Sequence, residues 1–343
     1  MTLKPLTPLT LTAFTPTYFP WSYLGALGLV EVLARHSPNP IHLSWSDSAI
    51  ACATIHGIAQ PDTLIQCVRS ALHTTAQEND PLWARPAEGR HPDKTLTYMR
   101  LTDAHTILEM LSPLDPVGWR WSGWFSEWPH KEGRKIKNSD DAKYTAVSPS
   151  HLIGLSDSLH KMSFTLIKSL VAATWNHVQV HPDAISEALW GPWQFTDYLS
   201  TKAEGQGGGL NAASFGWGEK TQADWAYTAK NPTDLRKNTV FVPLWLAIEG
   251  LSLFPTWRSS LDIHTIGFDR VSDSPHKNNQ NQLLMPLWSP PLSRDSIRAL
   301  LMTIDGQAAH QAVWHRRGVY HLWGSDVTQY NSNRQLRFPH VIW

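Results

Sequence analysis

The residues Thr239-Val-Phe-Val-Pro243-Leu-Trp-Leu-Ala-Ile-Glu-Gly-Leu-Ser-Leu-Phe-Pro255 form a nearly continuous apolar run with a proline towards each end. Residues 261–268 alternate as a half-buried strand does, and residues 283–288 predict another strand. Ser293 is placed to cap a short helix through Leu301, with apolar side chains on one side at Ile297, Leu300 and Leu301. A helix packed on at least two strands is the smallest unit that hides such surface, so residues 239–301 are predicted to be the core.

The N-terminal part shows the same mixture of helix and strand. Residues 21–35 are apolar almost all round until Glu31 and Arg35, which is typical of a buried helix. Residues 41–45 alternate as a strand, and residues 49–56 are suited to pair with them. A helix beginning at Pro61 has one apolar face, made by Leu64, Val68, Ala71 and Leu72. The predicted fold class is therefore α+β, with mixed helices and antiparallel strands.

The remaining elements are predicted from shorter patterns. We expect an extended arm over residues 1–20, a strand over 96–101 and a short helix over 104–111. Helices are expected from Ser148 through apolar positions up to 170, and over 183–199 with a break at Gly191. A hairpin about Arg317 and Gly318 is expected over 312–323, then an extended end over 338–343. A soft boundary divides an N-terminal α/β part, 1–145, from a C-terminal α+β part, 146–343; a boundary near 205 and a single domain are the alternatives.

Composition narrows the class of protein. Lys plus Arg equal Asp plus Glu at 29 each among 343 residues, so the formal net charge is zero, which disfavours a free-standing DNA-binding protein. The chain has 18 tryptophans, more than one core readily uses, which predicts extensive protein or nucleic-acid contact. Cys52 and Cys67 form no CxxC pair, so neither a disulfide framework nor a zinc site is expected. With no signal-peptide core and no run of about 18 apolar residues, a cytoplasmic location is predicted.

Three groups of polar side chains are candidate nucleic-acid contacts. Five cations lie within 13 residues, directly after a tryptophan-rich stretch: Lys131, Arg134, Lys135, Lys137 and Lys143. Cations neutralise phosphates and aromatic rings stack on unpaired bases, so we assign this loop to phosphates or a displaced strand. The alternative interpretation is a solvated loop.

A glycine-rich loop is the second group, because glycine lets backbone approach a DNA groove while amides and cations read base edges or phosphates. Its members are Lys202, Gln206, Gly207, Gly208, Asn211, Ser214 and Lys220, and a mobile linker is the alternative interpretation. Arg316 and Arg317 at the expected hairpin tip, with Arg334 and Arg337 nearby in sequence, form the third group. That tip is equally suited to contact a partner protein.

No pattern predicts an active site or a bound cofactor. The spacing of a P-loop is absent around Lys220. His177 and His181 have the i, i+4 spacing of metal ligands, but the HExxH glutamate is missing and Pro182 follows at once, so a surface pair is favoured. Carboxylates at Asp183 and Glu187, or at Asp140 and Asp141, lack the accompanying motif of a nuclease. Ser158-x-x-Lys161 lacks the partner motifs of an SxxK enzyme.

Several segments together resemble a known family. They are Leu246-Ala247-x-Glu249-x-Leu251-x-Leu253-Phe254-Pro255, Thr265-x-Gly267-Phe268, Pro286-Leu287-Trp288 with Arg298, the mixed stretch 211–230 and, more weakly, Tyr23-Leu24-Gly-Ala-Leu27-Gly28-Leu29. They resemble the compact, diverged large subunits of type I CRISPR Cascade effector complexes, over roughly a third of the chain. The resemblance implies a large, irregular, wedge-like subunit with long loops.

The resemblance also implies a function. Such non-catalytic subunits recognise the short PAM motif in duplex DNA, help to separate the strands and form the R-loop, and dock the helicase-nuclease, while base pairing with guide RNA reads the target. The implied partners are guide RNA, Cascade backbone subunits, target double-stranded DNA and the helicase-nuclease. Many large subunits end in a helical bundle, whereas this chain ends in strand-like segments, so a separate small subunit would supply the bundle. The alternatives are a guide-RNA-processing endonuclease that uses a histidine, and a Trp-rich interaction subunit without nucleic-acid contact.

Overall fold

The computed structural model describes residues 7–17, 19–77, 99–100, 125–127, 144–147, 164–194, 240–258, 263–271, 280–304, 310–330, 333–336 and 338–343. Its helices are α1 (Pro20–His36), α2 (Pro61–Gln77), α7 (Phe164–Val180), α8 (Ala184–Trp190), α9 (Phe241–Gly250), a 3₁₀ turn η5 (Leu251–Leu253), α10 (Arg294–Ile304) and α11 (Gln311–Arg316). Within these ranges no helix is long and apolar enough to cross a bilayer.

The strands form antiparallel sheets, as expected for the α+β class. One sheet has the order β1 (Leu9–Leu11), β3 (Ala53–His56), β2 (His42–Trp45) and β11 (Leu292–Ser293). A second has the order β13 (Asn333–Leu336), β12 (Val319–Tyr330), β10 (Gln280–Trp288) and β9 (Phe268–Val271), with β14 (His340–Val341) also on β12. The smaller sheets are β4 (Met99–Arg100) with β6 (Tyr144–Val147) and β5 (Phe125–Glu127), and β7 (Thr256–Arg258) with β8 (Ile263–Thr265).

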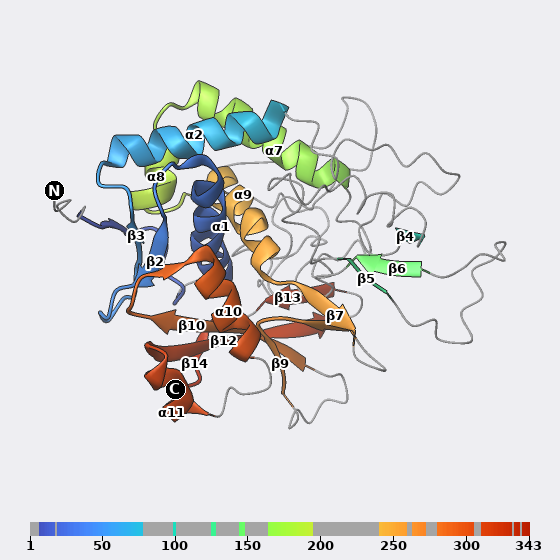
Figure 1. The fold of residues 1–343 in the computed structure, drawn as a ribbon. Coiled ribbons are helices and arrows are strands. Elements are labelled where there is room, and N and C mark those ends of the chain that lie inside the picture. Colours follow the sequence, from blue (N-terminus) through green and yellow to red (C-terminus); the bar gives the residue numbers. More distant parts are fainter. Residues whose placement is uncertain are drawn as a thin grey trace, which may run out of the picture.

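Helices α1 and α9 form the centre of the molecule, and they pack directly against each other (Figure 1). A Cβ atom at Gly28 would overlap the carbonyl oxygen of Leu246, and one at Gly250 would overlap that of Leu24. Because glycine has no side chain, the backbones of the two helices can touch at both points. All of α9 is buried, and α1 is buried from Pro20 to Leu33.

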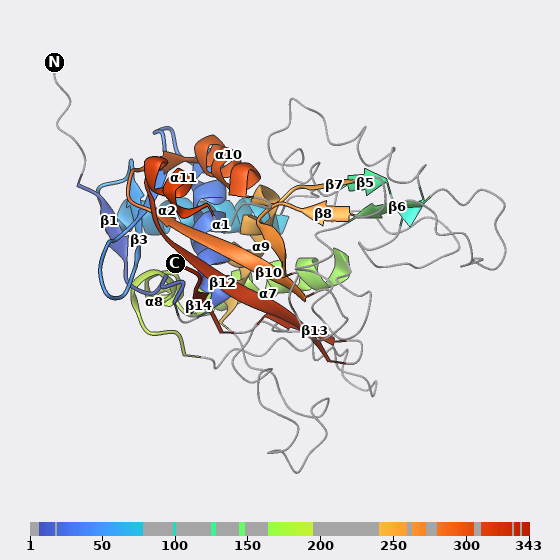
Figure 2. The ribbon, with the colours of Figure 1, turned by 90° about the horizontal axis from the view of Figure 1, so that it is seen from below.

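Other elements enclose this pair from two sides. Helix α2 packs on α1 and α7, and α7 and α8 pack on α9. Strands β10 and β12 lie in front of α1 and α9 when the molecule is seen from below (Figure 2). The indole nitrogen of Trp288 donates to the carbonyl oxygen of Leu43 at 2.8 Å, which ties the two larger sheets together. The α1–α9 pair therefore lies between helices α2, α7 and α8 and the two joined sheets.

Buried charges fix the helices at defined positions. An Arg35 guanidinium nitrogen lies 2.7 Å from a carboxylate oxygen of Glu249, and both side chains are almost fully buried. Arg294, the first residue of α10, contacts Glu31 of α1 at 2.7 Å. Removing one partner of a buried pair leaves an uncompensated charge, which costs about 3–5 kcal/mol. These pairs specify how α1 meets α9 and α10.

Most of the predicted elements are confirmed. The buried helix in 21–35 is α1, the helix at Pro61 is α2, and the strands in 41–45 and 49–56 are β2 and β3. The capping prediction at Ser293 is also correct, because its hydroxyl accepts a hydrogen bond from the backbone N–H of Ser296 at 3.3 Å. Ile297, Leu300 and Leu301 are buried as expected. The N-terminal arm is extended at β1, and the helix expected over 183–199 is present as α8, which ends before the expected break at Gly191; residues 195–199 lie outside the described residues.

Two predictions of single elements were wrong. The strand expected over 261–268 is interrupted by a turn between β8 and β9, where Gly267 has a φ of 78° that side-chain-bearing residues rarely adopt. The first arm of the hairpin expected over 312–323 is helix α11, which ends at the positive φ of Gly318 before β12 begins. The helix expected from Ser148 through apolar positions up to 170 is confirmed where it is described: α7 runs to Val180, and Leu170, Thr174 and Val178 lie on its buried face. Residues 148–163 lie outside the described residues.

The predicted division at residue 145 or 205 stays a prediction. The described residues of 1–145 and of 146–343 nevertheless contribute to one hydrophobic cluster, and β11 pairs with β2 across that division. The expected helix over 104–111 lies outside the described residues.

Gly28→Ala tests the close crossing of α1 and α9. We expect a loss of about 3 kcal/mol or more in the free energy of unfolding, because backbone must move to admit the methyl group. Gly25→Ala is the comparison in the same helix and should lose less, since its Cβ would meet the ring of Phe14 at 2.7 Å but no backbone atom closer than the carbonyl oxygen of Pro243 at 3.4 Å. Denaturant unfolding of both variants makes the comparison, and equal losses would contradict the crossing described here.

The stability should also depend on the protonation of His56. Burial, and then the neighbouring His42 directly across the β2–β3 ladder, lower the pKa of His56, whose ring contacts the Ser44 hydroxyl at 2.9 Å. A lowered histidine pKa contributes stability that is present above about pH 6.5, the unfolded value, and is lost as the pH falls through the folded value. Unfolding free energies measured from pH 7.5 to 5 should therefore fall more for the native chain than for His56→Gln. Parallel curves would show that His56 is not responsible.

Candidate functional site

The two loops predicted to bind nucleic acid lie outside the described residues. The first holds Lys131, Arg134, Lys135, Lys137 and Lys143; the second holds Lys202, Gln206, Gly207, Gly208, Asn211, Ser214 and Lys220. Their assignment stays a prediction from the sequence.

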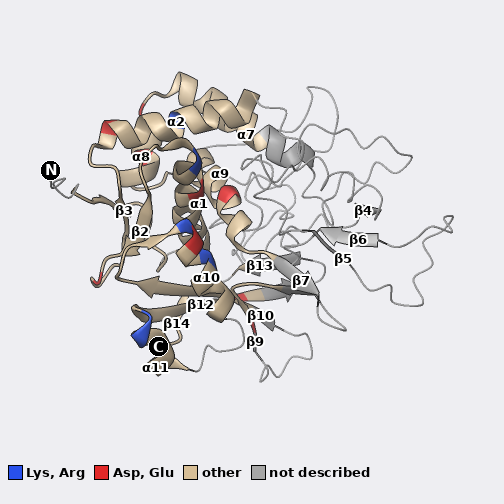
Figure 3. Cartoon of the chain, viewed as in Figure 1, with Lys and Arg blue, Asp and Glu red and all other residues tan. Residues whose placement is uncertain are grey.

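The third group, Arg316 and Arg317, lies at the C-terminal end of α11 and is exposed (Figure 3). The guanidinium carbon of Arg317 lies 5.1 Å from the ring centroid of Trp314, which is itself fully buried. A cation over an indole ring is attracted by the ring's negative face, so the side chain of Arg317 has a preferred position. Arg316 is the last residue of the same helix. Arg337 lies outside the described residues, and of Arg334 only the backbone is described.

Charge is unevenly divided between the described and the other residues. The described side chains include six Lys or Arg, all arginine, against nine Asp or Glu; 23 of the 29 cations and 20 of the 29 acids belong to the rest of the chain. Among those six arginines, only Arg316 and Arg317 are exposed. A role that requires several phosphate contacts would therefore have to use cations of the remaining segments.

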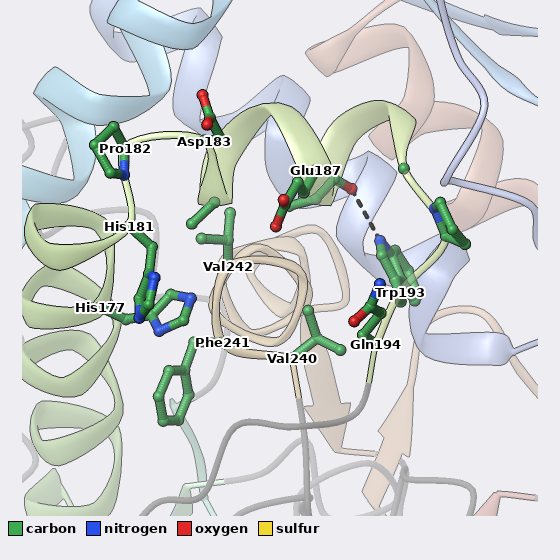
Figure 4. A pocket seen from close by; sticks show the side chains of 14 residues that line it. His177, His181, Pro182, Asp183, Glu187, Trp193, Gln194, Val240, Phe241 and Val242 are labelled. Carbon is green, nitrogen blue, oxygen red and sulfur yellow. Dashed lines mark hydrogen bonds between the residues drawn. The ribbon is translucent and has the colours of Figure 1, made fainter.

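The described residues also form a pocket of about 710 Å³ between the end of α7, helix α8 and the start of α9 (Figure 4). Its walls carry two imidazoles, two carboxylates, an amide and several apolar side chains: His177, His181, Asp183, Glu187, Trp193, Gln194, Val240, Phe241 and Val242. None of the described lining residues is Lys or Arg.

The histidine wall of this pocket is built on one helical turn. The backbone N–H of His181 donates to the carbonyl oxygen of His177 at 2.8 Å, so the helical geometry of α7 continues through His181. The two imidazole centroids are 4.6 Å apart, and the ring of His177 meets Phe241 edge-on at 5.6 Å. The Ala184 N–H then donates to the carbonyl oxygen of His181 at 3.1 Å, which fixes the corner between α7 and α8.

The opposite wall belongs to α8 and the residues that follow it. Asp183 and Glu187 are exposed and one turn apart, and Figure 4 shows the Glu187 side chain on the other side of Val242 from the histidines. The indole nitrogen of Trp193 donates to the carbonyl oxygen of Ala188 at 2.9 Å, and its ring stacks on Trp21 at 4.6 Å. Trp193 is thus fixed against the core rather than free to close over the pocket.

The described residues offer little covalent chemistry. They contain no group of three or more His, Cys, Asp or Glu side chains arranged to hold a metal ion. Cys52 and Cys67 are free thiols, and burial raises the pKa of each, which favours the weakly nucleophilic protonated form.

In the sequence, His177 with His181 and Asp183 with Glu187 were considered as two separate pairs. That all four side chains line one pocket was not predicted. The break at Gly191 and the proline after His181 are the signals of a tight α7–α8 corner, but a corner alone does not identify what faces it. The buried pairs of Glu31 and Glu249 were also missed, although each carboxylate interrupts an otherwise apolar helix.

Comparison with models of known protein families finds no match, and comparison with curated proteins finds no significant match.

Proposed function

We propose that this chain is the non-catalytic large subunit of a type I CRISPR surveillance complex in the cytoplasm. In this role it recognises the PAM in duplex DNA, assists strand separation and R-loop formation, and docks the helicase-nuclease. Its partners are guide RNA, the Cascade backbone subunits, target double-stranded DNA and the helicase-nuclease.

The observation that supports this proposal is the convergence of the segments that carry the family resemblance. Residues 246–255 lie in α9 and η5, and Pro255 accepts a hydrogen bond from Ile266 at 3.0 Å. The carbonyl oxygen of Gly267 accepts from Leu284 of β10 at 2.8 Å. The more weakly matching segment, 23–29, is the part of α1 that meets α9 at Gly28. The described segments of the resemblance, which are far apart in sequence, therefore belong to one packed unit; the stretch 211–230 lies outside the described residues.

Particular residues of the resemblance also have defined structural roles. Glu249 forms the buried ion pair with Arg35, and Trp288 ties the two larger sheets together. A Cβ atom at Gly267 would lie 2.7 Å from the ring of Phe254, so glycine permits that ring to pack beneath the turn. These contacts fix α1, α9 and the two larger sheets relative to one another.

The DNA-contacting roles are assigned to those segments by charge. Lys131, Arg134, Lys135, Lys137 and Lys143 would bind phosphates or the displaced strand. The loop with Gln206 and Asn211 would read the PAM, with Lys202 and Lys220 on its phosphates, and Arg316 would add a contact from α11. A formal net charge of zero predicts weak DNA binding by the isolated chain and stronger binding in the complex.

Replacing the five cations of the 131–143 loop by glutamate tests the phosphate role in the assembled complex. We expect weaker binding to every duplex, and the slope of log affinity against log salt should decrease by about 0.9 for each phosphate that is no longer neutralised. Gln206→Ala with Asn211→Ala should instead weaken binding only to PAM-containing duplexes, by about 1–3 kcal/mol for each base that these amides read.

Asp62→Asn is the control, because Asp62 is exposed on α2 and belongs to none of the three groups. Arg316→Glu distinguishes a DNA contact from a protein contact, since only the latter changes the composition of the purified complex. The DNA-binding proposal would be abandoned if replacing all five cations by glutamate changed neither the DNA affinity nor the slope of log affinity against log salt.

A further inference from the structure

We propose that His177 and His181 form a two-histidine chelating site for a divalent first-row transition metal ion of the Cu²⁺, Ni²⁺ and Zn²⁺ class. The remaining coordination positions of the ion would face the 710 Å³ pocket. This inference does not depend on the proposed role in a CRISPR complex.

The two imidazoles are spaced and held so that one ion can contact both. They are four residues apart on continuous helical backbone, which puts both on one face, and their centroids are 4.6 Å apart. Metal–nitrogen bonds to histidine are about 2.0–2.1 Å, so two rings at this separation lie within the span of a single ion. Phe241 supports the ring of His177, and the hydrogen bond from Ala184 holds the backbone of His181.

The electrostatics of the pocket support the same site. The pocket into which both imidazoles project is lined, among the described residues, by two carboxylates and by no Lys or Arg. Asp183 and Glu187 are exposed, and no described cation forms an ion pair with either. Their negative potential attracts a dication to the histidine wall and adds to the affinity without direct coordination.

The ligand set determines the class of metal. Imidazole nitrogen suits zinc, copper and nickel, whereas magnesium and calcium require oxygen ligands. The described residues provide two imidazole ligands at this site and no third protein ligand in position. Affinity should follow the order Cu²⁺ > Ni²⁺, with Zn²⁺ below Cu²⁺.

The test uses the full-length chain and titrates NiCl₂ by isothermal calorimetry, with Cu²⁺ paramagnetic resonance as the site-specific readout. His181→Gln is the first variant, because the exposed His181 side chain can change without disturbing the core. His177→Gln is the second. His73→Gln is the matched control, since His73 is exposed on α2 and has no histidine one turn away.

We expect His177→Gln and His181→Gln each to lose the one bound Ni²⁺ ion per chain. Both should also lose the Cu²⁺ paramagnetic resonance signal of coordination by two nitrogens, while His73→Gln retains the ion and the signal. Asp183→Asn with Glu187→Gln should lower the affinity several-fold and leave the stoichiometry unchanged. Thermal melting without metal verifies that each variant is folded, and saturating Ni²⁺ should raise the Tm of the native chain but not of His181→Gln.

Three results would overturn the proposal. One is unchanged stoichiometry in both His177→Gln and His181→Gln. Another is binding that disappears only in the carboxylate double variant and is shared by Mg²⁺, which would identify an acidic site instead. The third is loss of the bound Ni²⁺ ion in His73→Gln alone.

Discussion

The contact between the backbones of α1 and α9 is the constraint on which the rest of the structure depends. Gly28 and Gly250 leave no room for a side chain at the crossing, so the two helices have one relative position. The Arg35–Glu249 and Glu31–Arg294 pairs then fix the rotation of α1 and the place of α10. Because Glu31, Glu249 and Arg35 are almost fully buried, slippage of α1 would leave a buried charge without its partner, which costs about 3–5 kcal/mol.

The same constraint determines several of the residues that resemble Cascade large subunits, since Glu249, Gly267 and Trp288 each have a defined neighbour inside the molecule. The proposed function divides the roles: the packed unit would position the chain, and the cation-rich segments would contact nucleic acid. Among the described side chains, nine are acidic and six are arginine, so the proposal assigns most phosphate contacts to the other segments.

Much of the fold was predictable because local signals agreed with burial. Ser293 both caps α10 and precedes its apolar face, and the all-apolar pattern of α1 has no other solution than burial. The errors arose where the pattern of apolar residues predicted one continuous element across a glycine. A positive φ at Gly267 or Gly318 ends the element there, whatever the surrounding pattern. The pocket was not predictable, since its walls meet only through the tertiary packing of α7 and α8 on α9. The predicted DNA-contacting loops lie outside the described residues and rest on the sequence alone.

The central claim is that this chain works as a subunit of an RNA-guided complex, and co-purification tests it most directly. The chain would be tagged, co-expressed with the products of its neighbouring genes, and isolated by the tag at moderate salt. If the chain has the proposed function, a stable assembly is expected that contains repeated backbone subunits and RNA of one uniform, guide-sized length. A clean, RNA-free monomer, recovered although the partners are expressed, would contradict it.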